Sequence, residues 1–96
     1  MPIFNETYKS AAVSSANISY QDSLELKKMV ENGHSMLGQR PTGFFFKLYD
    51  DVELNKYQNL SPALNELLTS ASEQGYRLIE VDESAEMAEE AQEFVW

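Results

Sequence analysis

Gly43-Phe-Phe-Phe-Lys-Leu-Tyr49 opens the stretch that decides the fold, residues 43–82. Aromatic residues fit the half-buried surface of a strand, and successive side chains of a strand point to opposite faces. The two faces of this strand would carry Phe44, Phe46 and Leu48 on one side, and Phe45, Lys47 and Tyr49 on the other. We expect the first face to be core and the second to be only partly covered and open to a partner.

A helix and a second strand follow after a polar link over residues 50–59. Ser61-Pro62 predicts a helix start, because a serine oxygen caps free N–H groups and proline suits the first helical position. Apolar residues recur at helical spacing, namely Leu64, Leu67, Leu68 and Ala71, and Gly75 is suited to end the helix. Residues 76–82 are apolar on both faces, which predicts an interior strand. A strand-helix-strand unit of this length predicts a right-handed crossover to a parallel neighbour.

The first part of the chain predicts a similar arrangement of strand, helix and strand. Residues 11–15 indicate a strand, and Ser19 with Asp22 resembles a capping box at a helix start. Asn32-Gly33 would end that helix, whose expected buried stripe consists of Leu26, Met29 and Val30, with Leu24 beside it. Residues 34–43 predict a short strand and a turn, so that a hairpin leads into the aromatic strand.

The predicted order is β-α-β-β-α-β. It indicates an α+β fold, a two-layer sandwich of the ferredoxin-like or split βαβ type, with both helices on one face of the sheet. Ser84 would cap an extra C-terminal helix, with Met87, Ala88 and Ala91 facing inward and Phe94, Val95 and Trp96 following. We expect a single domain over residues 1–96, with a loosely ordered arm at 1–9 and an acidic C-terminal segment at 83–96.

Composition excludes several kinds of site. The chain has no cysteine, which excludes disulfides, thiolate metal sites and a cysteine nucleophile and suits a reducing cytoplasm. No signal-peptide pattern is present, and no apolar stretch approaches the roughly 20 residues that span a bilayer. We therefore expect a soluble, unexported protein of the cytoplasm. His34 is the only histidine, it follows a predicted helix end, and no triad can be assembled around it.

Charge carries the clearest functional signal. Sixteen acidic and seven basic residues give a net charge of −9, which repels nucleic acid and anionic membranes and attracts basic surfaces. The acids concentrate near the C-terminus, where no lysine or arginine accompanies Glu80, Asp82, Glu83, Glu86, Glu89, Glu90 and Glu93. This segment is either a solvated end that keeps the protein in solution or a surface that binds a basic partner.

A carboxylate cluster is the one enzymatic alternative. Asp50 and Asp51 follow the aromatic strand, while Glu80 and Asp82 share one face of the last strand. If those strands are neighbours, the four side chains would meet at one sheet edge and bind Mg²⁺, with Lys47 or Lys56 stabilising a phosphoryl transition state. A phosphate-binding glycine loop is absent from the sequence. We expect no cofactor, no metal ligand and no catalytic residue.

Several short motifs resemble a family of small uncharacterised acidic domains carried on bacterial plasmids and phages. They are Ser14-Ser-Ala-Asn-Ile18 before a helix, Gly43 before paired aromatics, the Leu64–Gly75 helix, Asp82 after an apolar strand, and a closing Trp96. Members of that family have histidine where this chain has Asn17, and a further aspartate where it has Glu83 or Ser84. The resemblance implies a mobile genetic element and carries no activity over to this chain.

The leading hypothesis is a non-enzymatic interaction protein that inhibits a basic, nucleic-acid-binding host protein by imitating the phosphate backbone, as anti-defence inhibitors do. Its expected partner-binding residues are acids and exposed aromatics: Asp50, Asp51, Glu53, Glu80, Asp82, Glu83, Glu86, Glu89, Glu90, Glu93, Phe45, Tyr49 and Tyr57. The alternatives are the Mg²⁺-dependent phosphodiester enzyme and a self-associating regulatory module that forms a homodimer through the aromatic strand face. Direct binding to nucleic acid or membrane is not expected.

Overall fold

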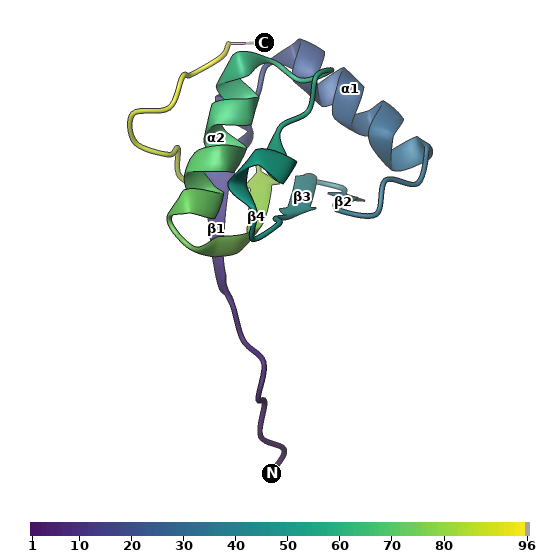
Figure 1. Cartoon of the computed structure of the whole chain (residues 1–96). Helices are drawn as coiled ribbons and strands as arrows, with labels where there is room; N and C mark the ends of the chain where they lie inside the picture. The colour runs from purple at the N-terminus through teal and green to yellow at the C-terminus, as the bar shows by residue number, and fades with distance from the viewer. Residues whose placement is uncertain (96) are drawn as a thin grey trace.

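The computed structural model describes residues 1–95 and shows a four-stranded sheet with two α-helices (Figure 1). The elements in chain order are β1 (Lys9–Ser14), η1 (Ser15–Asn17), α1 (Tyr20–Glu31), β2 (Leu37–Arg40), β3 (Gly43–Lys47), η2 (Val52–Asn55), α2 (Pro62–Glu73) and β4 (Tyr76–Asp82). The predicted β-α-β-β-α-β order and the two-layer α+β sandwich are confirmed. The expectation for Trp96 lies outside the described residues.

The sheet has the strand order β1-β4-β3-β2. β1 and β4 are parallel, whereas β4 with β3 and β3 with β2 are antiparallel pairs. β4 is therefore an interior strand, as its two apolar faces predicted. β1 and β2 also run parallel with other strands between them, which is the arrangement of a split βαβ unit.

The parallel crossover predicted for the second half is wrong, because β3 and β4 are antiparallel neighbours. The reason is the link before α2, which carries the chain along the sheet before the helix begins. Ser72, in the last turn of α2, donates a hydrogen bond of 2.9 Å to the carbonyl oxygen of Tyr49, just after β3. The last turn of α2 thus lies at the same end of the sheet as the end of β3. β4 starts there and runs antiparallel to β3.

Both helices cover the same face of the sheet, as predicted. Phe46 and Ile79 face each other across β3 and β4, and both are buried, whereas the next residue of β3, Lys47, is exposed. Leu26 of α1 and Leu64 of α2 are fully buried in the same cluster. The buried apolar cluster consists of Val13, Ile18, Leu26, Met29, Leu37, Phe44, Phe46, Leu48, Leu60, Leu64, Leu68, Ala71, Ile79 and Val81. Among the elements of residues 1–95, no helix lies over the opposite face of the sheet.

The two helices begin with the predicted serine caps, and one carboxylate joins them. The Ser19 hydroxyl oxygen accepts from the Asp22 N–H at 3.1 Å, and that of Ser61 accepts from the Leu64 N–H at 3.2 Å. The buried Asp22 carboxylate accepts from the Ser61 N–H at 2.9 Å and from the Ser61 hydroxyl. A first-turn acid of α1 therefore holds the start of α2, near the positive end of both helix dipoles.

The predicted C-terminal helix is wrong, because residues 83–95 contain no helix. On a helix, Glu86 would lie three and four residues from Glu89 and Glu90, and such like-charge neighbours repel. Glu90 has φ 63°, a left-handed value that interrupts a helix. The main chain of this segment instead hydrogen-bonds to β1 and η1, as described below.

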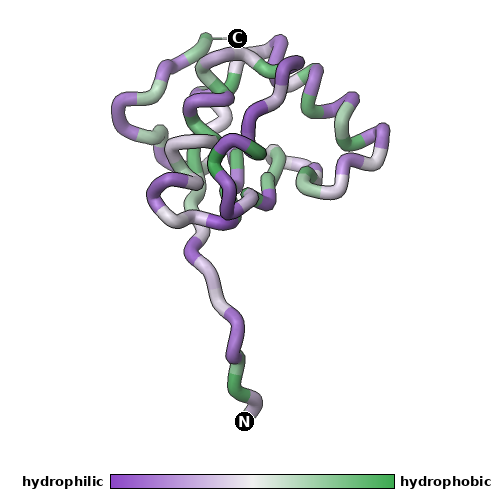
Figure 2. The backbone as a smooth tube through the Cα atoms, viewed as in Figure 1, coloured by the Kyte–Doolittle hydropathy of each residue, from purple (hydrophilic) through white to green (hydrophobic). Residues whose placement is uncertain are grey.

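Residues 1–8 form neither helix nor strand and are all exposed. They extend away from the sheet as a continuation of β1 (Figure 1). Figure 2 shows a hydrophobic stretch near the tip of this arm, where Ile3 and Phe4 are 85% and 82% exposed. None of the helices within residues 1–95 is long and apolar enough to cross a membrane.

Candidate partner-binding surface

Residues 83–95, which we call the strap, bind to the end of β1 and to η1. The Ser14 N–H donates to the Glu86 carbonyl oxygen at 3.0 Å, and the Phe94 N–H donates to that of Ala16 at 2.7 Å. Between them the Asn17 side chain donates to the Gln92 carbonyl oxygen at 3.0 Å and accepts from the Ala88 N–H at 2.9 Å. Asn17 is only 3% exposed, so one buried amide holds the strap at two points.

The strap carries a concentration of acidic charge that no other described residue neutralises. Its five glutamates, Glu83, Glu86, Glu89, Glu90 and Glu93, are all exposed, and their carboxylates form no ion pair or hydrogen bond with any residue of 1–95. Four basic side chains form ion pairs elsewhere within residues 1–95: Arg40 contacts Glu80 at 2.9 Å, Lys56 contacts Glu53 at 3.0 Å, Lys28 contacts Glu25 at 3.5 Å, and Arg77 pairs with Asp50. The strap is therefore a surface of uncompensated negative charge.

A groove of about 820 Å³ lies between the strap, α2 and β1. Its apolar lining comes from Ala11, Val13, Leu67, Ala71, Ile79 and Ala88, and its acids are Glu66 of α2 and Glu89 and Glu90 of the strap. No lysine, arginine or histidine of the described chain lines it. Lys9 contacts two lining residues, since its Nζ donates to the Gln74 carbonyl oxygen at 3.1 Å and lies 4.5 Å from the Tyr76 ring centroid. Figure 1 shows the strap looping outward beside α2.

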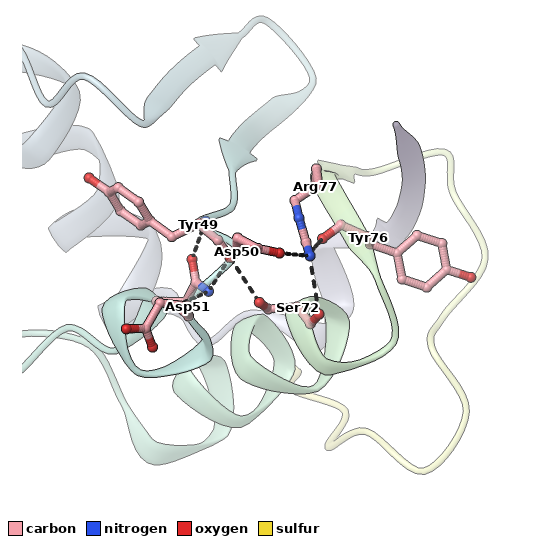
Figure 3. A network of polar contacts seen from close by, with 7 residues as sticks. Tyr49, Asp50, Asp51, Ser72, Tyr76 and Arg77 are labelled. Carbon is pink, nitrogen blue, oxygen red and sulfur yellow. Dashed lines mark hydrogen bonds and ion pairs between the residues drawn. The ribbon is translucent and has the colours of Figure 1, made fainter. Parts of the chain in front are cut away.

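The acids after β3 lie at the opposite end of the sheet from the strap and have structural roles. Asp50 pairs with Arg77, whose guanidinium also donates to the Tyr76 carbonyl oxygen at 2.7 Å (Figure 3). The Asp51 side chain caps η2 by accepting from the Glu53 N–H at 3.1 Å. Asp50, Asp51 and Glu53 thus already contact other residues of the chain: Asp50 pairs with Arg77, Asp51 caps η2, and Glu53 contacts Lys56.

Asn55 organises this loop. It is 1% exposed, and its side-chain oxygen accepts from the Tyr49 N–H at 2.8 Å. Its side-chain nitrogen donates to the carbonyl oxygens of Tyr49 and Asp51 at 3.1 and 3.3 Å. The Tyr49 carbonyl oxygen also accepts from the Ser72 hydroxyl (Figure 3), so the loop is fixed to the end of α2.

The four-carboxylate cluster does not form, which corrects the premise of the magnesium-enzyme alternative. Because β3 and β4 are antiparallel, Asp50 lies beside Arg77 at one end of β4, whereas Asp82 lies opposite Gly43 at the other. No three His, Asp or Glu side chains within residues 1–95 are placed to hold a metal ion. The pKa of Asp82 is lowered from its ordinary value, chiefly because the Ser84 N–H and then the Thr42 hydroxyl donate to its carboxylate, at 2.8 and 2.9 Å.

Phe45 and Glu80 lie on the uncovered face of the sheet, away from the strap. They are cross-strand neighbours, and the Phe45 ring lies over Gly38, where a β-carbon would come within 2.3 Å of it. Phe45 is 37% exposed, as is Tyr49, so the predicted partial covering of this side of β3 is confirmed. Tyr57 packs edge-on against His34 at 5.4 Å, and burial, followed by the Tyr49 hydroxyl, raises the pKa of its phenol.

The thirteen predicted residues therefore occupy three separate regions: the strap with Asp82, the η2 loop with Tyr49 and Tyr57, and the open sheet face with Phe45 and Glu80. Sequence reasoning missed Asn17 and Glu66, which position and complete the groove. The signal available in the sequence for Asn17 was a polar residue between the apolar Ala16 and Ile18. Glu66 gave none, because an exposed helical acid is ordinary.

Comparison with protein families gave a match over most of the chain. The model described as "Family of unknown function (DUF5983) C-terminal domain" matches residues 10–96. Neither curated protein sequences nor solved structures gave a match. The expectation of an uncharacterised domain family is confirmed, and the matched region spans the sheet, both helices and the strap.

Proposed function

The chain belongs to the DUF5983 C-terminal domain family, and we propose that it is a non-enzymatic acidic protein that inhibits or modulates a basic, nucleic-acid-binding host protein. The observation that carries this proposal is the strap, whose five glutamates are exposed and unneutralised by the described residues. Exposed charge of one sign attracts an oppositely charged partner and accelerates encounter.

The arrangement of the strap supports imitation of nucleic acid. Its main chain is held at Ser14, Ala16 and Asn17, so the glutamates are attached to a fixed backbone instead of a free end. Negative charges held in place resemble the phosphates that a cationic groove binds, and fixed charges lose less entropy on binding than disordered ones.

The proposal includes a biological setting, which is a mobile genetic element in a bacterial host. The motifs around Asn17, Gly43 and Asp82 resemble domains carried on plasmids and phages. A mobile element benefits from blocking host defence proteins that bind its nucleic acid, so we place the protein in the bacterial cytoplasm as an anti-defence inhibitor.

The test compares two sets of charge substitutions in a competition experiment. Glu86, Glu89, Glu90 and Glu93 are changed to Gln as the strap set, which removes four charges. Asp50, Asp51 and Glu53 are changed to Asn or Gln as the loop set, which removes three charges at the opposite end of the sheet. Partners are captured from bacterial lysate at low salt, and each purified partner is then assayed for displacement from DNA. We expect the wild-type protein to displace DNA from the partner in a salt-dependent way. The strap set should lose most of this displacement and most of its salt dependence, whereas the loop set should keep the displacement and the salt dependence. Equal displacement by wild type and strap set, with the fold intact, refutes the proposal.

Self-association through the open sheet face is a second candidate, favoured by the exposure of Phe45 beside Gly38. A homodimer through this face would bury the Phe45 ring, which is a suitable anchor for a protein interface. Light scattering of the wild type and of Phe45→Ser measures it directly. A monomer at all concentrations would exclude this candidate and leave the first untouched.

A further inference from the structure

β1 is an edge strand with one open side. It pairs with β4 on one side only, and on the other side the Ser14 N–H donates to the Glu86 carbonyl oxygen. Because main-chain groups two residues apart in a strand point the same way, the N–H and C=O of Ala12 face this open side too. No residue of 1–95 pairs with Ala12 there. An unpaired strand edge is a template for a further strand.

The strap groove runs along this same strand. Ala11 and Val13 of β1 line it together with Leu67 and Ala71 of α2, so aliphatic chains have an apolar surface to contact. Its charged lining is acidic, from Glu66, Glu89 and Glu90. Such a lining complements lysine and arginine, whose aliphatic stems pack on apolar surface while their charged ends reach carboxylates.

We infer that the open edge of β1 and the strap groove bind an extended basic segment of the partner, which adds as a strand beside β1 and extends the pairing that Glu86 begins. This inference rests on the proposed function and names how the partner is held: by its main chain at Ala12, and by lysine or arginine side chains in the groove. Strand addition of this kind takes affinity from main-chain hydrogen bonds and specificity from pockets for alternate side chains.

A second copy of this chain fits the groove poorly. Each copy has a net charge of −9, and its strap glutamates would meet those of its neighbour at this edge. Like charges placed against one another oppose association, so a basic segment is the complementary occupant.

The test uses two synthetic peptides of equal charge with the full chain. One alternates lysine with valine and can form a strand; the other alternates lysine with proline and lacks alternate N–H donors. We expect the first to bind with slowed hydrogen exchange at the Ala12 amide and shifts at Leu67 and Ala71, and the second to bind at least about tenfold more weakly, the effect of losing main-chain hydrogen bonds.

Two variants of Ala12 complete the test. Ala12→Pro removes the N–H on the open side, a position where edge strands tolerate proline, and Ala12→Val keeps it. We expect about a tenfold loss of lysine-valine affinity for the first and little change for the second. If Ala12→Pro fails to fold, amide exchange of the wild type with the two peptides decides alone.

Two results would overturn the inference. Equal affinity for both peptides would show binding by charge alone, which leaves the proposed function standing and excludes strand addition. If the lysine-valine peptide binds without slowing hydrogen exchange at the Ala12 amide, the peptide binds at a site other than the open edge of β1. The DNA-displacement assay with the strap set judges the proposed function separately.

Discussion

Replacing Asn55 by alanine tests how the loop between β3 and α2 is held. The substitution removes hydrogen bonds of 2.8 and 3.1 Å to Tyr49 and a longer one of 3.3 Å to Asp51. The Tyr49 carbonyl oxygen keeps the Ser72 hydroxyl at 2.9 Å, and that of Asp51 keeps the Leu54 N–H at 3.1 Å. The Tyr49 N–H alone loses its partner. At about 1 kcal/mol for each of the two shorter bonds, plus up to about 1 for the unsatisfied N–H, we expect a loss of about 2–3 kcal/mol.

Urea unfolding followed by circular dichroism measures this loss as a change in the free energy of unfolding. Asn59→Ala is the matched control, because Asn59 is exposed and makes a single hydrogen bond of 3.3 Å to Glu25; we expect a change below about 0.5 kcal/mol. If the two variants unfold at the same urea concentration, Asn55 does not hold the loop as described.

Three further predictions concern the core, the strap and a carboxylate. Leu68→Ala, at a fully buried site, is expected to cost about 2–5 kcal/mol, whereas Glu89→Ala on the exposed strap changes stability by under about 0.5; similar melting temperatures would mean that the core is misplaced. Asn17→Ala should release the strap and speed hydrogen exchange at the Ala88 amide, with Gln21→Ala, an exposed position of α1, as control. Unchanged exchange would contradict the role of Asn17 in holding the strap. The Asp82 carboxyl should titrate below its ordinary pKa of 3.8. Its hydrogen bonds therefore stabilise the fold above pH 3.8, and this stabilisation is lost as the pH falls through the lowered pKa. Carbon-13 titration measures the pKa, and Thr42→Val should raise it.

Local signals predicted the helices well, because each depends on a few neighbouring residues. Ser19, Ser61 and Gly75 have the cap and turn roles that their types favour, and Leu26 and Leu64 are buried as their spacing predicted. The pairing of β3 with β4 was not predictable this way. It depends on the path of the link before α2, which is set by Asn55 and by Asn65, whose side chain binds the main chain of Tyr57 and Leu60.

The candidate site was predicted in part. The glutamates of the strap were recognised because they are close together in the sequence and no lysine or arginine lies among them. Their arrangement was not, because it depends on Asn17, which is far from them in the chain and close to them in space. Phe45 and Glu80 were correctly expected to be accessible, but the sheet separates them from the strap, and alternation along a strand cannot show which exposed residues share a surface.

The pairing of β1 with β4 has a consequence for how the protein is made. Of the four strands of this sheet, β1 is synthesised first, and its one strand partner within residues 1–95, β4, is synthesised last. Until β4 emerges, Val13 has no neighbouring strand to cover it, and both sides of β1 are available to other strands. The hairpin of β2 and β3 can form early, but the sheet closes only after β4 has been synthesised, and until then β1 is exposed to pairing with other chains.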